Sequence, residues 1–289
     1  MNSSGAGLSG WLNGLAGVII FSGSLPATRL AVAEIDPVFL TVARAAIAGV
    51  IALALLVVFR SARPGRKDMV PLAVVALGVV VGFPLLTALA LKHVTSAHSI
   101  VFIGLLPLAT AAFAVLRGGE RPRAPFWLFS LLGSLLVSGY AYAQSSSAAS
   151  VGDLLMLAAI VVCGLGYAEG ARLSRRLGGW QVICWALVLS LPVMLLLAVM
   201  EAPASWANVG GAALAGLAYV SLFSMLIGFV FWYRGLALGG IASVGQLQLL
   251  QPFFGLALAG LLLGEHVSGL MLAVTALVIL CVAGARRFA

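Results

Sequence analysis

The sequence predicts an all-α integral membrane protein with ten transmembrane helices, arranged as two inverted five-helix repeats. Three observations carry this prediction: an apolar composition, an alternating placement of positive charge, and an internal repeat. Of the 289 residues, 63% are hydrophobic and 8% are charged, whereas a soluble domain carries about 25% charged residues. Too few charges remain to cover a water-exposed surface, so the bilayer is the expected solvent.

Ten apolar runs are long enough to cross a membrane, because a helix needs roughly 20 apolar residues to span about 30 Å of hydrocarbon. Short linkers with proline, glycine or charged residues separate the runs and leave no room for a soluble domain. The first ten residues carry no Lys or Arg, so we expect no cleaved signal peptide. The predicted spans are 11–32, 37–59, 69–91, 96–117, 125–143, 152–173, 180–200, 210–234, 241–263 and 267–285.

Positive charge alternates between successive gaps, which is typical of membrane proteins that follow the positive-inside rule. If the N-terminus is placed in the cytoplasm, the inner gaps carry thirteen of the 16 Lys and Arg residues. This pattern predicts a multi-pass protein of the bacterial inner (plasma) membrane with both termini in the cytoplasm. It also explains the net charge of +8, so we expect no nucleic-acid partner. The inner cations are Arg60, Arg63, Arg66, Lys67, Arg117, Arg121, Arg123, Arg172, Arg175, Arg176, Arg234, Arg286 and Arg287.

Two stretches 145 residues apart resemble each other and divide the chain into halves. The first reads PLATAAFAVLRGGE at 107–120, and the second reads PFFGLALAGLLLGE at 252–265. Each half, 1–147 and 148–289, would hold five helices, and an odd number makes the second half enter the membrane in the opposite orientation. Inverted repeats of this kind are common in transporters, where the substrate path lies between the halves.

Several of these positions also carry a family resemblance. The pattern Pro26-Ala-Thr-Arg29-Leu30, followed by Pro37 and Ala43-Arg44, resembles the first half of the EamA type of the drug/metabolite transporter superfamily. The two proline-to-Gly-Glu runs resemble the signature that this family repeats. The resemblance covers nearly the whole chain and implies a five-plus-five inverted fold that exports small metabolites. Bacterial exporters of aromatic amino acids belong to this group.

Prolines and polar residues inside the apolar runs are the candidate path residues. We expect Pro26, Pro84, Pro107 and Pro252 to break their helices and to shape or gate the central path, with simple packing kinks as the alternative. Amides and hydroxyls are costly in lipid, so they should face a cavity or other helices. The predicted substrate path is lined by Phe83, Thr87, His98, Ser99, Phe102, Leu106, Tyr167, Gln248 and Gln251.

Glu169 and Arg44 are charged residues that lie well inside apolar runs. Glu169 precedes Arg172 by three residues, and we expect a structural ion pair, with a proton-coupling carboxylate as the less favoured alternative. Arg44 lies about two turns into its helix. We expect it to reach Glu34, Asp36 or backbone carbonyls, with a substrate carboxylate as the less favoured partner.

Catalytic and cofactor motifs are absent from the sequence. His93, His98 and His266 lack a further set of ligands, so no metal site is predicted. The chain has no P-loop, no HExxH and no GxSxG, and we therefore expect neither an enzyme nor a cofactor.

These features predict a secondary or facilitative transporter that exports amino acids, aromatic or hydrophobic ones foremost, and related small metabolites by alternating access. The expected partners are the small-molecule substrate and the lipid bilayer. Export of other metabolites, such as nucleotide sugars or drugs, is the alternative, and a membrane enzyme or a non-transporting receptor are the other classes. The sequence does not identify the substrate, and it does not show whether transport is coupled to protons, which conformation is favoured at rest or how many chains assemble. A monomer is compatible with it.

Overall fold

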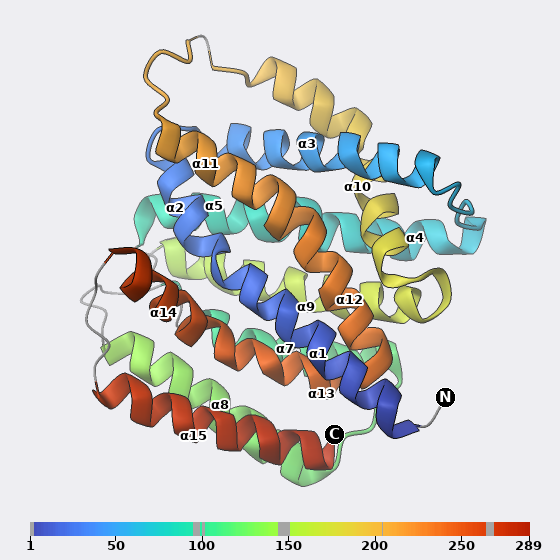
Figure 1. Cartoon of the computed structure of the whole chain (residues 1–289), viewed down its shortest axis with the longest axis vertical. Helices are drawn as coiled ribbons and strands as arrows, with labels where there is room; N and C mark the ends of the chain where they lie inside the picture. The colour runs from blue at the N-terminus through green and yellow to red at the C-terminus, as the bar shows by residue number, and fades with distance from the viewer. Residues whose placement is uncertain (1–2, 95–98, 100–101, 144–150, 204, 264–268) are drawn as a thin grey trace.

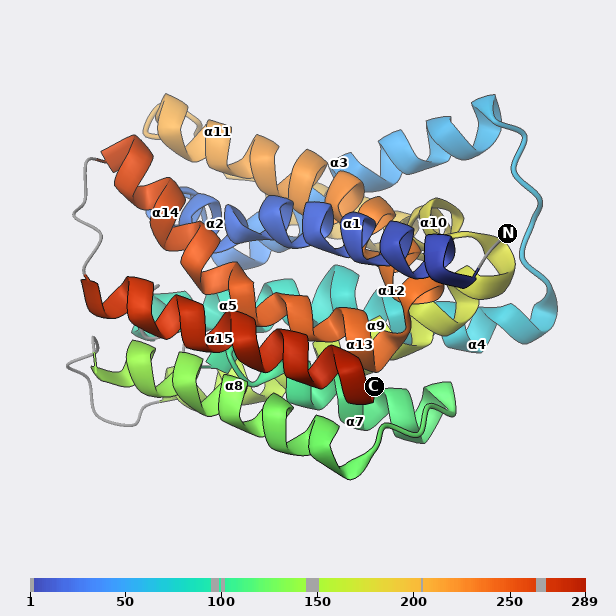
Figure 2. The same cartoon turned by 60° about the horizontal axis from the view of Figure 1, so that its bottom comes forward.

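The computed structural model describes residues 3–94, 99, 102–143, 151–203, 205–263 and 269–289, and the regular elements among them are all helical. Figure 1 shows long helices that run between two ends of the molecule, and Figure 2 shows them distributed over more than one layer. The elements are α1 (Ser3–Ser22), α2 (Ser24–Val32), α3 (Pro37–Val58), α4 (Arg66–Val75), the π-helix η1 (Ala76–Gly82), α5 (Phe83–His93), α7 (Leu106–Gly118), α8 (Ala124–Ala143), α9 (Val151–Leu177), α10 (Gly179–Met200), α11 (Gly211–Tyr219), the π-helix η2 (Val220–Ile227), α12 (Gly228–Gly239), α13 (Ile241–Gly245), the 3₁₀ helix η3 (Gln246–Leu250), α14 (Gln251–Leu263) and α15 (Gly269–Phe288).

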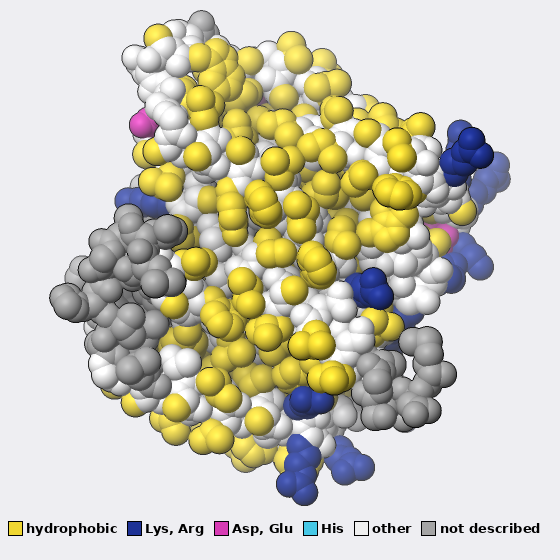
Figure 3. Space-filling view, viewed as in Figure 1, with side chains coloured by type: hydrophobic (Ala, Val, Ile, Leu, Met, Phe, Trp, Pro, Cys, Tyr) yellow, Lys and Arg dark blue, Asp and Glu magenta, His cyan; other side chains and the backbone are white. Residues whose placement is uncertain are grey.

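The outer surface of the helices is apolar. Leu116 and Val58 are 74% and 72% exposed, and Figure 3 shows hydrophobic side chains over much of one face. Such a surface is stable against hydrocarbon but not against water. Within the described residues, six helical stretches are long and apolar enough to cross a membrane: Gly7–Val32, Pro37–Val58, Arg66–His93, Val151–Leu177, Gly179–Met200 and Gly211–Gly239. The apolar helices Leu106–Gly118 and Ala124–Tyr140 are shorter.

Five of the described helical runs are interrupted, and a proline follows four of the interruptions; η2, between α11 and α12, is followed by Gly228 instead. Pro26 comes after the turn at Gly23, Pro84 after η1, Pro107 after a turn at 104–105, and Pro252 after η3. Proline has no N–H, and it fits the first turn of a helix, where no intrahelical acceptor exists for that group. The predicted helix-break prolines therefore each lie in the first turn of a new helix.

Glycines allow the closest helix contact, between α1 and α12. A Cβ atom added at Gly235 would lie 2.5 Å from the backbone nitrogen of Gly14, and one at Gly10 would lie 2.5 Å from that of Gly239. No side chain fits between the two backbones at these positions. Helices that are far apart in the sequence, α1 and α12, therefore pack against each other. The same holds for α3 and α10, and for α8 and α15, which lie side by side in Figures 1 and 2.

Most of the Lys and Arg side chains in Figure 3 lie along the right and lower edge, the end of the molecule where Figure 1 places both termini. We call this the basic end; it carries the loops 59–65 and 119–123 and the C-terminal residues 286–287. At this end the buried carboxylate of Glu169 pairs with Arg172 at 2.8 Å and also with Arg117 of α7. Arg176 of α9 pairs with the buried Asp68. These pairs join α9 to α4 and α7.

The Gly-Glu pair after α7 has a structural role. Gly119 adopts a φ of 70°, a left-handed conformation that favours glycine, and it ends the helix. The next residue, Glu120, then accepts hydrogen bonds from the backbone N–H groups of Ile241 and Ala242, at 2.8 and 2.7 Å. A carboxylate is favourable at this helix start because the N–H groups there carry partial positive charge. Glu120 thus fixes the start of α13, and Arg175 pairs with it at 2.7 Å.

Asp36 caps α3 at the opposite end of the molecule. Its Oδ1 accepts hydrogen bonds from the N–H groups of Val38 and Phe39, and its Oδ2 lies 3.3 Å from Lys92 Nζ. Partial burial raises the pKa of Asp36, but the hydrogen bonds and the lysine outweigh this effect and lower the pKa below its usual value. The carboxylate therefore stabilises the fold in its charged form.

Candidate functional site

The candidate site is a small cavity at the level of the helix interruptions. Lining residues come from α1 and α2 on both sides of the turn at Gly23, from α3, η1, α5 and α9, from the start of α7, and from η2, α12 and α14. The volume of the cavity is about 40 Å³, whereas a cavity that holds a ligand usually has a volume of several hundred Å³. A space of this size has room for no more than a few water molecules. Its lining consists of Phe21, Ser24, Leu25, Thr28, Arg44, Val79, Phe83, Pro84, Thr87, Ile103, Leu106, Tyr167, Ser224, Phe229 and Gln251.

The break between α1 and α2 exposes backbone carbonyls beside the cavity. Tyr219 donates a hydrogen bond of 2.7 Å to the carbonyl oxygen of Ile20, and Gln251 donates one of 3.3 Å to that of Phe21. Carbonyls left free inside a membrane need such partners, because no water is available in the hydrocarbon. Tyr219 at the end of α11 and Gln251 at the start of α14 therefore stabilise the break between α1 and α2.

Arg44 of α3 is the most unusual group in the cavity. It is 6% exposed, and its Nη2 donates to the hydroxyl of Ser224 at 3.2 Å. The same hydroxyl accepts from Ser24 at 2.8 Å. The Nε of Arg44 has no hydrogen-bond partner, and no carboxylate pairs with Arg44 among the residues that the structure describes. A buried cation with one hydroxyl partner is costly, and such groups mark functional sites in membranes.

The predicted acidic partners of Arg44 were wrong. Glu34 accepts a hydrogen bond of 2.6 Å from the backbone N–H of Gly210, and Asp36 binds Lys92 and the start of α3. The eight residues between Asp36 and Arg44 correspond to about 12 Å along a helix. Arg44 therefore lies away from the loop, inside the helix bundle.

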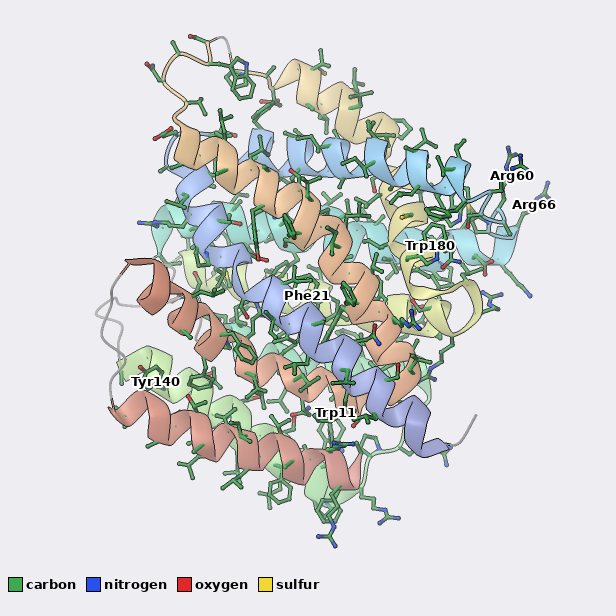
Figure 4. The ribbon with its side chains drawn as sticks, viewed as in Figure 1. Trp11, Phe21, Arg60, Arg66, Tyr140 and Trp180 are labelled. Atoms are coloured by element: carbon green, nitrogen blue, oxygen red, sulfur yellow. The ribbon has the colours of Figure 1, made fainter. Side chains whose placement is uncertain are left out.

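Aromatic rings form the apolar side of the cavity. The ring of Phe21 lies 5.1 Å from that of Phe229, edge to face, and Tyr167 lies 5.9 Å from Phe229 in a similar arrangement. Figure 4 labels Phe21 near the centre of the molecule. Such edge-to-face contacts stabilise a rigid apolar wall. The cavity therefore has a cationic, hydroxyl-bearing side and an aromatic side, the surroundings that suit an amphipathic molecule.

The structure brings five of the nine predicted path residues to this cavity. They are Phe83, Thr87, Leu106, Tyr167 and Gln251, and the predicted helix-break residue Pro84 joins them. The hydroxyl of Thr87 has no partner among the described atoms. A role for these residues in substrate binding stays a prediction.

The other predicted path residues lie elsewhere. Ser99, Phe102 and Gln248 are buried but do not line the cavity. Ser99 and Phe102 precede the turn at 104–105, and Gln248 packs beside Tyr167. His98 lies outside the described residues.

Sequence reasoning missed the small hydroxyl residues of the cavity. Ser24, Thr28 and Ser224 resemble the many other serines and threonines of the apolar runs, so no local signal distinguishes them. Arg44 did carry a signal, because a cation inside an apolar run needs a partner or a function. Among the described residues, no group of three His, Cys, Asp or Glu side chains lies close enough to hold a metal ion.

Comparisons with known proteins agree with this architecture. A solved crystal structure that is 22% identical superposes with a TM-score of 0.77 and covers 97% of this chain and 99% of its own. The fold of the two chains is therefore the same.

Curated relatives carry transporter names. The chain is 69% identical, over 97% of its length and 98% of the relative's, to a Bacillus subtilis (strain 168) protein named "Uncharacterized transporter YdeK". It is 24% identical, over 82% of its length and 83% of the relative's, to an "Uncharacterized transporter" of Archaeoglobus fulgidus. The model of the EamA-like transporter family matches this chain twice, at residues 8–139 and 150–286. This multi-pass membrane protein therefore belongs to the EamA-like transporter family.

Proposed function

We propose that this chain exports amino acids with aromatic or other hydrophobic side chains, and related small metabolites, by alternating access. The observation that carries the proposal is Arg44, a buried guanidinium that lines the cavity without a carboxylate partner among the described residues. A substrate carboxylate would complete its hydrogen bonds. The facing rings of Phe21, Tyr167 and Phe229 suit an apolar side chain.

The path in this proposal lies between two inverted halves, 1–147 and 148–289, of five membrane-spanning helices each. Corresponding helix bounds support this division: α14 begins and ends 145 residues after α7, and α15 begins and ends 145 residues after α8. Both halves contain a π-helix in their third helix, η1 at 76–82 and η2 at 220–227. The two matches to the family model agree with a duplication.

In the proposed orientation, the basic end and both termini face the cytoplasm of a bacterial inner membrane. The positive-inside rule supports this choice. A cavity of about 40 Å³ is too small for an amino acid, so the proposal requires the cavity to widen when substrate binds. Opening toward the basic end would separate the ion pairs that Glu169 makes with Arg117 and that Asp68 makes with Arg176.

Uptake into sealed proteoliposomes tests the proposal. Phenylalanine should enter faster with the protein than without it, whereas phenethylamine, which lacks the carboxylate, should enter at the same rate with and without the protein. Protein-free liposomes are the control, and the same assay with and without a pH gradient separates proton antiport from facilitated movement. If phenethylamine and phenylalanine move equally well, or if neither moves, the assignment to amino-acid export is wrong.

A further inference from the structure

A second depression lies apart from the central cavity, at the basic end. It is a groove between the end of α3, the loop 59–65, the start of α4 and α10, and its volume is about 690 Å³. The groove shares no lining residue with the central cavity. Figure 4 shows this part of the molecule at the right, where Arg60, Arg66 and Trp180 are labelled.

The walls of the groove are apolar and open to the outside. Leu53 and Val57 of α3 and Leu189 of α10 line it and are 43%, 67% and 44% exposed. Aliphatic side chains exposed on a membrane-spanning helix face hydrocarbon. The seven residues from Leu53 to Arg60 correspond to about 10 Å of helix, so the groove runs inward from the basic end along the direction of a lipid chain.

The mouth of the groove is cationic. Arg60 and Arg63 line it, no acidic residue does, and neither arginine makes an ion pair with the residues that the structure describes. The acid nearest in sequence, Asp68, is engaged elsewhere: it pairs with Arg176, and its Oδ2 accepts from the backbone N–H of Gly65 at 2.9 Å. The positive charge at the mouth is therefore not neutralised locally.

The backbone at Arg60 is an independent sign that this side chain is needed. Its φ is 48°, a left-handed conformation that side chains other than glycine rarely adopt. Hydrogen bonds from Arg60 N to Val57 O (3.1 Å) and from Ser61 N to Leu56 O (2.9 Å) close α3 in the motif that normally places glycine at this position. An arginine here strains the backbone, and strain of this kind is concentrated at functional sites.

An aromatic side chain forms part of the groove wall. Trp185 of α10 lines the wall, and its indole Nε1–H is buried without a partner among the described atoms. A buried donor without an acceptor is costly.

We propose that this groove binds an anionic phospholipid. The phosphate lies between Arg60 and Arg63, and an acyl chain follows the apolar wall of α3 and α10. A cationic mouth complements a headgroup that carries net negative charge. The exposed apolar walls favour a lipid over a soluble phosphate, which has nothing to place against them.

Lipid binding to purified, delipidated protein in detergent tests this proposal. The probes are phosphatidylglycerol, phosphatidylcholine with identical acyl chains, and inorganic phosphate, and binding is measured by native mass spectrometry and by the shift in melting temperature. We expect phosphatidylglycerol to bind at least about tenfold more tightly than phosphatidylcholine, and phosphate alone to give no shift. Stabilisation by phosphate alone, or equal binding of the two lipids, would overturn the proposal.

Two variants locate the site. The double variant Arg60→Gln/Arg63→Gln should lower phosphatidylglycerol affinity about 30-fold, the factor that corresponds to about 1 kcal/mol for each arginine near an anionic headgroup. The matched control, Arg121→Gln/Arg123→Gln, removes two exposed arginines from another loop of the basic end and should keep the preference. Equal losses in both double variants would show that the preference comes from overall charge and not from the groove.

The single variant Arg60→Gly separates a lipid site from a purely structural loop. Glycine relieves the left-handed backbone and removes the guanidinium. If Arg60 binds lipid, this variant loses most of the phosphatidylglycerol preference although its lipid-free melting temperature rises. An unchanged preference in a more stable protein would contradict the proposal.

Discussion

Replacement of Arg44 by methionine should have opposite effects on stability and on transport. The guanidinium is 6% exposed and has one hydroxyl partner at 3.2 Å, Ser224, while its Nε has none among the described residues. Methionine has a similar length and no charge, so Arg44→Met removes the desolvation cost and keeps most of the packing. An arginine that serves the fold should not behave in this way, because its loss would leave a cavity or an unpaired acid.

The expected magnitudes follow from these contacts. Burial of an ion costs several kcal/mol, and the single hydrogen bond to a charged donor returns about 1.5–3 kcal/mol, so we expect a net stabilisation of about 1–3 kcal/mol. For a chain of this size this corresponds to a rise of about 2–6 °C in melting temperature. Loss of the ionic hydrogen bonds to a substrate carboxylate should cost about 2–3 kcal/mol of binding, or about 30- to 140-fold in KM.

Both effects can be measured on the same preparations, by thermal unfolding in detergent and by phenylalanine uptake into proteoliposomes. Arg121→Met, which removes an exposed arginine outside the cavity, is the matched control and should change neither quantity. A lower melting temperature for Arg44→Met together with an unchanged KM would refute the reasoning and make Arg44 a structural residue.

Three further predictions concern the helix contacts and the loops. Gly235→Ala should lower the free energy of unfolding by about 1–3 kcal/mol, because the new methyl forces α1 and α12 apart. Gly139→Ala, whose methyl meets nothing within 4 Å, is the control. Equal melting temperatures of the two variants would show that the close contact is not required. Glu120→Gln weakens the charged cap of α13 and should cost about 1 kcal/mol in thermal unfolding; an unaltered melting temperature would mean that the carboxylate charge is not needed there. The lowered pKa of Asp36 predicts stability that is fully present above its usual value of 3.8 and lost as the pH falls through the lower pKa of the folded state. Asp36→Asn should remove this part of the pH dependence, so the melting temperatures of the two proteins should converge as the pH falls below 3.8. A difference between them that stays the same at every pH would count against it.

The sequence by itself determined the class of the protein and the positions of its helices. Apolar length and the placement of charge are local properties, and the solvent that surrounds a helix acts on them directly. The prolines at 26, 84, 107 and 252 also acted locally, because a missing N–H prevents the hydrogen bond that would continue a helix. Most of the described helices begin and end within five residues of the predicted bounds, but α1 begins at Ser3 and not at residue 11, and the start of the predicted span 96–117 lies outside the described residues.

The tertiary structure alone decided which side chains meet at the cavity. The contact between Arg44 and Ser224 joins residues 180 positions apart, and that between Ser24 and Ser224 joins residues 200 positions apart. Such contacts depend on the rotation of each helix about its axis and on the glycine contacts that set the distance between helices, neither of which the hydropathy pattern contains. For this reason the sequence paired Arg44 with the wrong acids, and only the packed bundle shows that this buried cation has no carboxylate partner among the described residues.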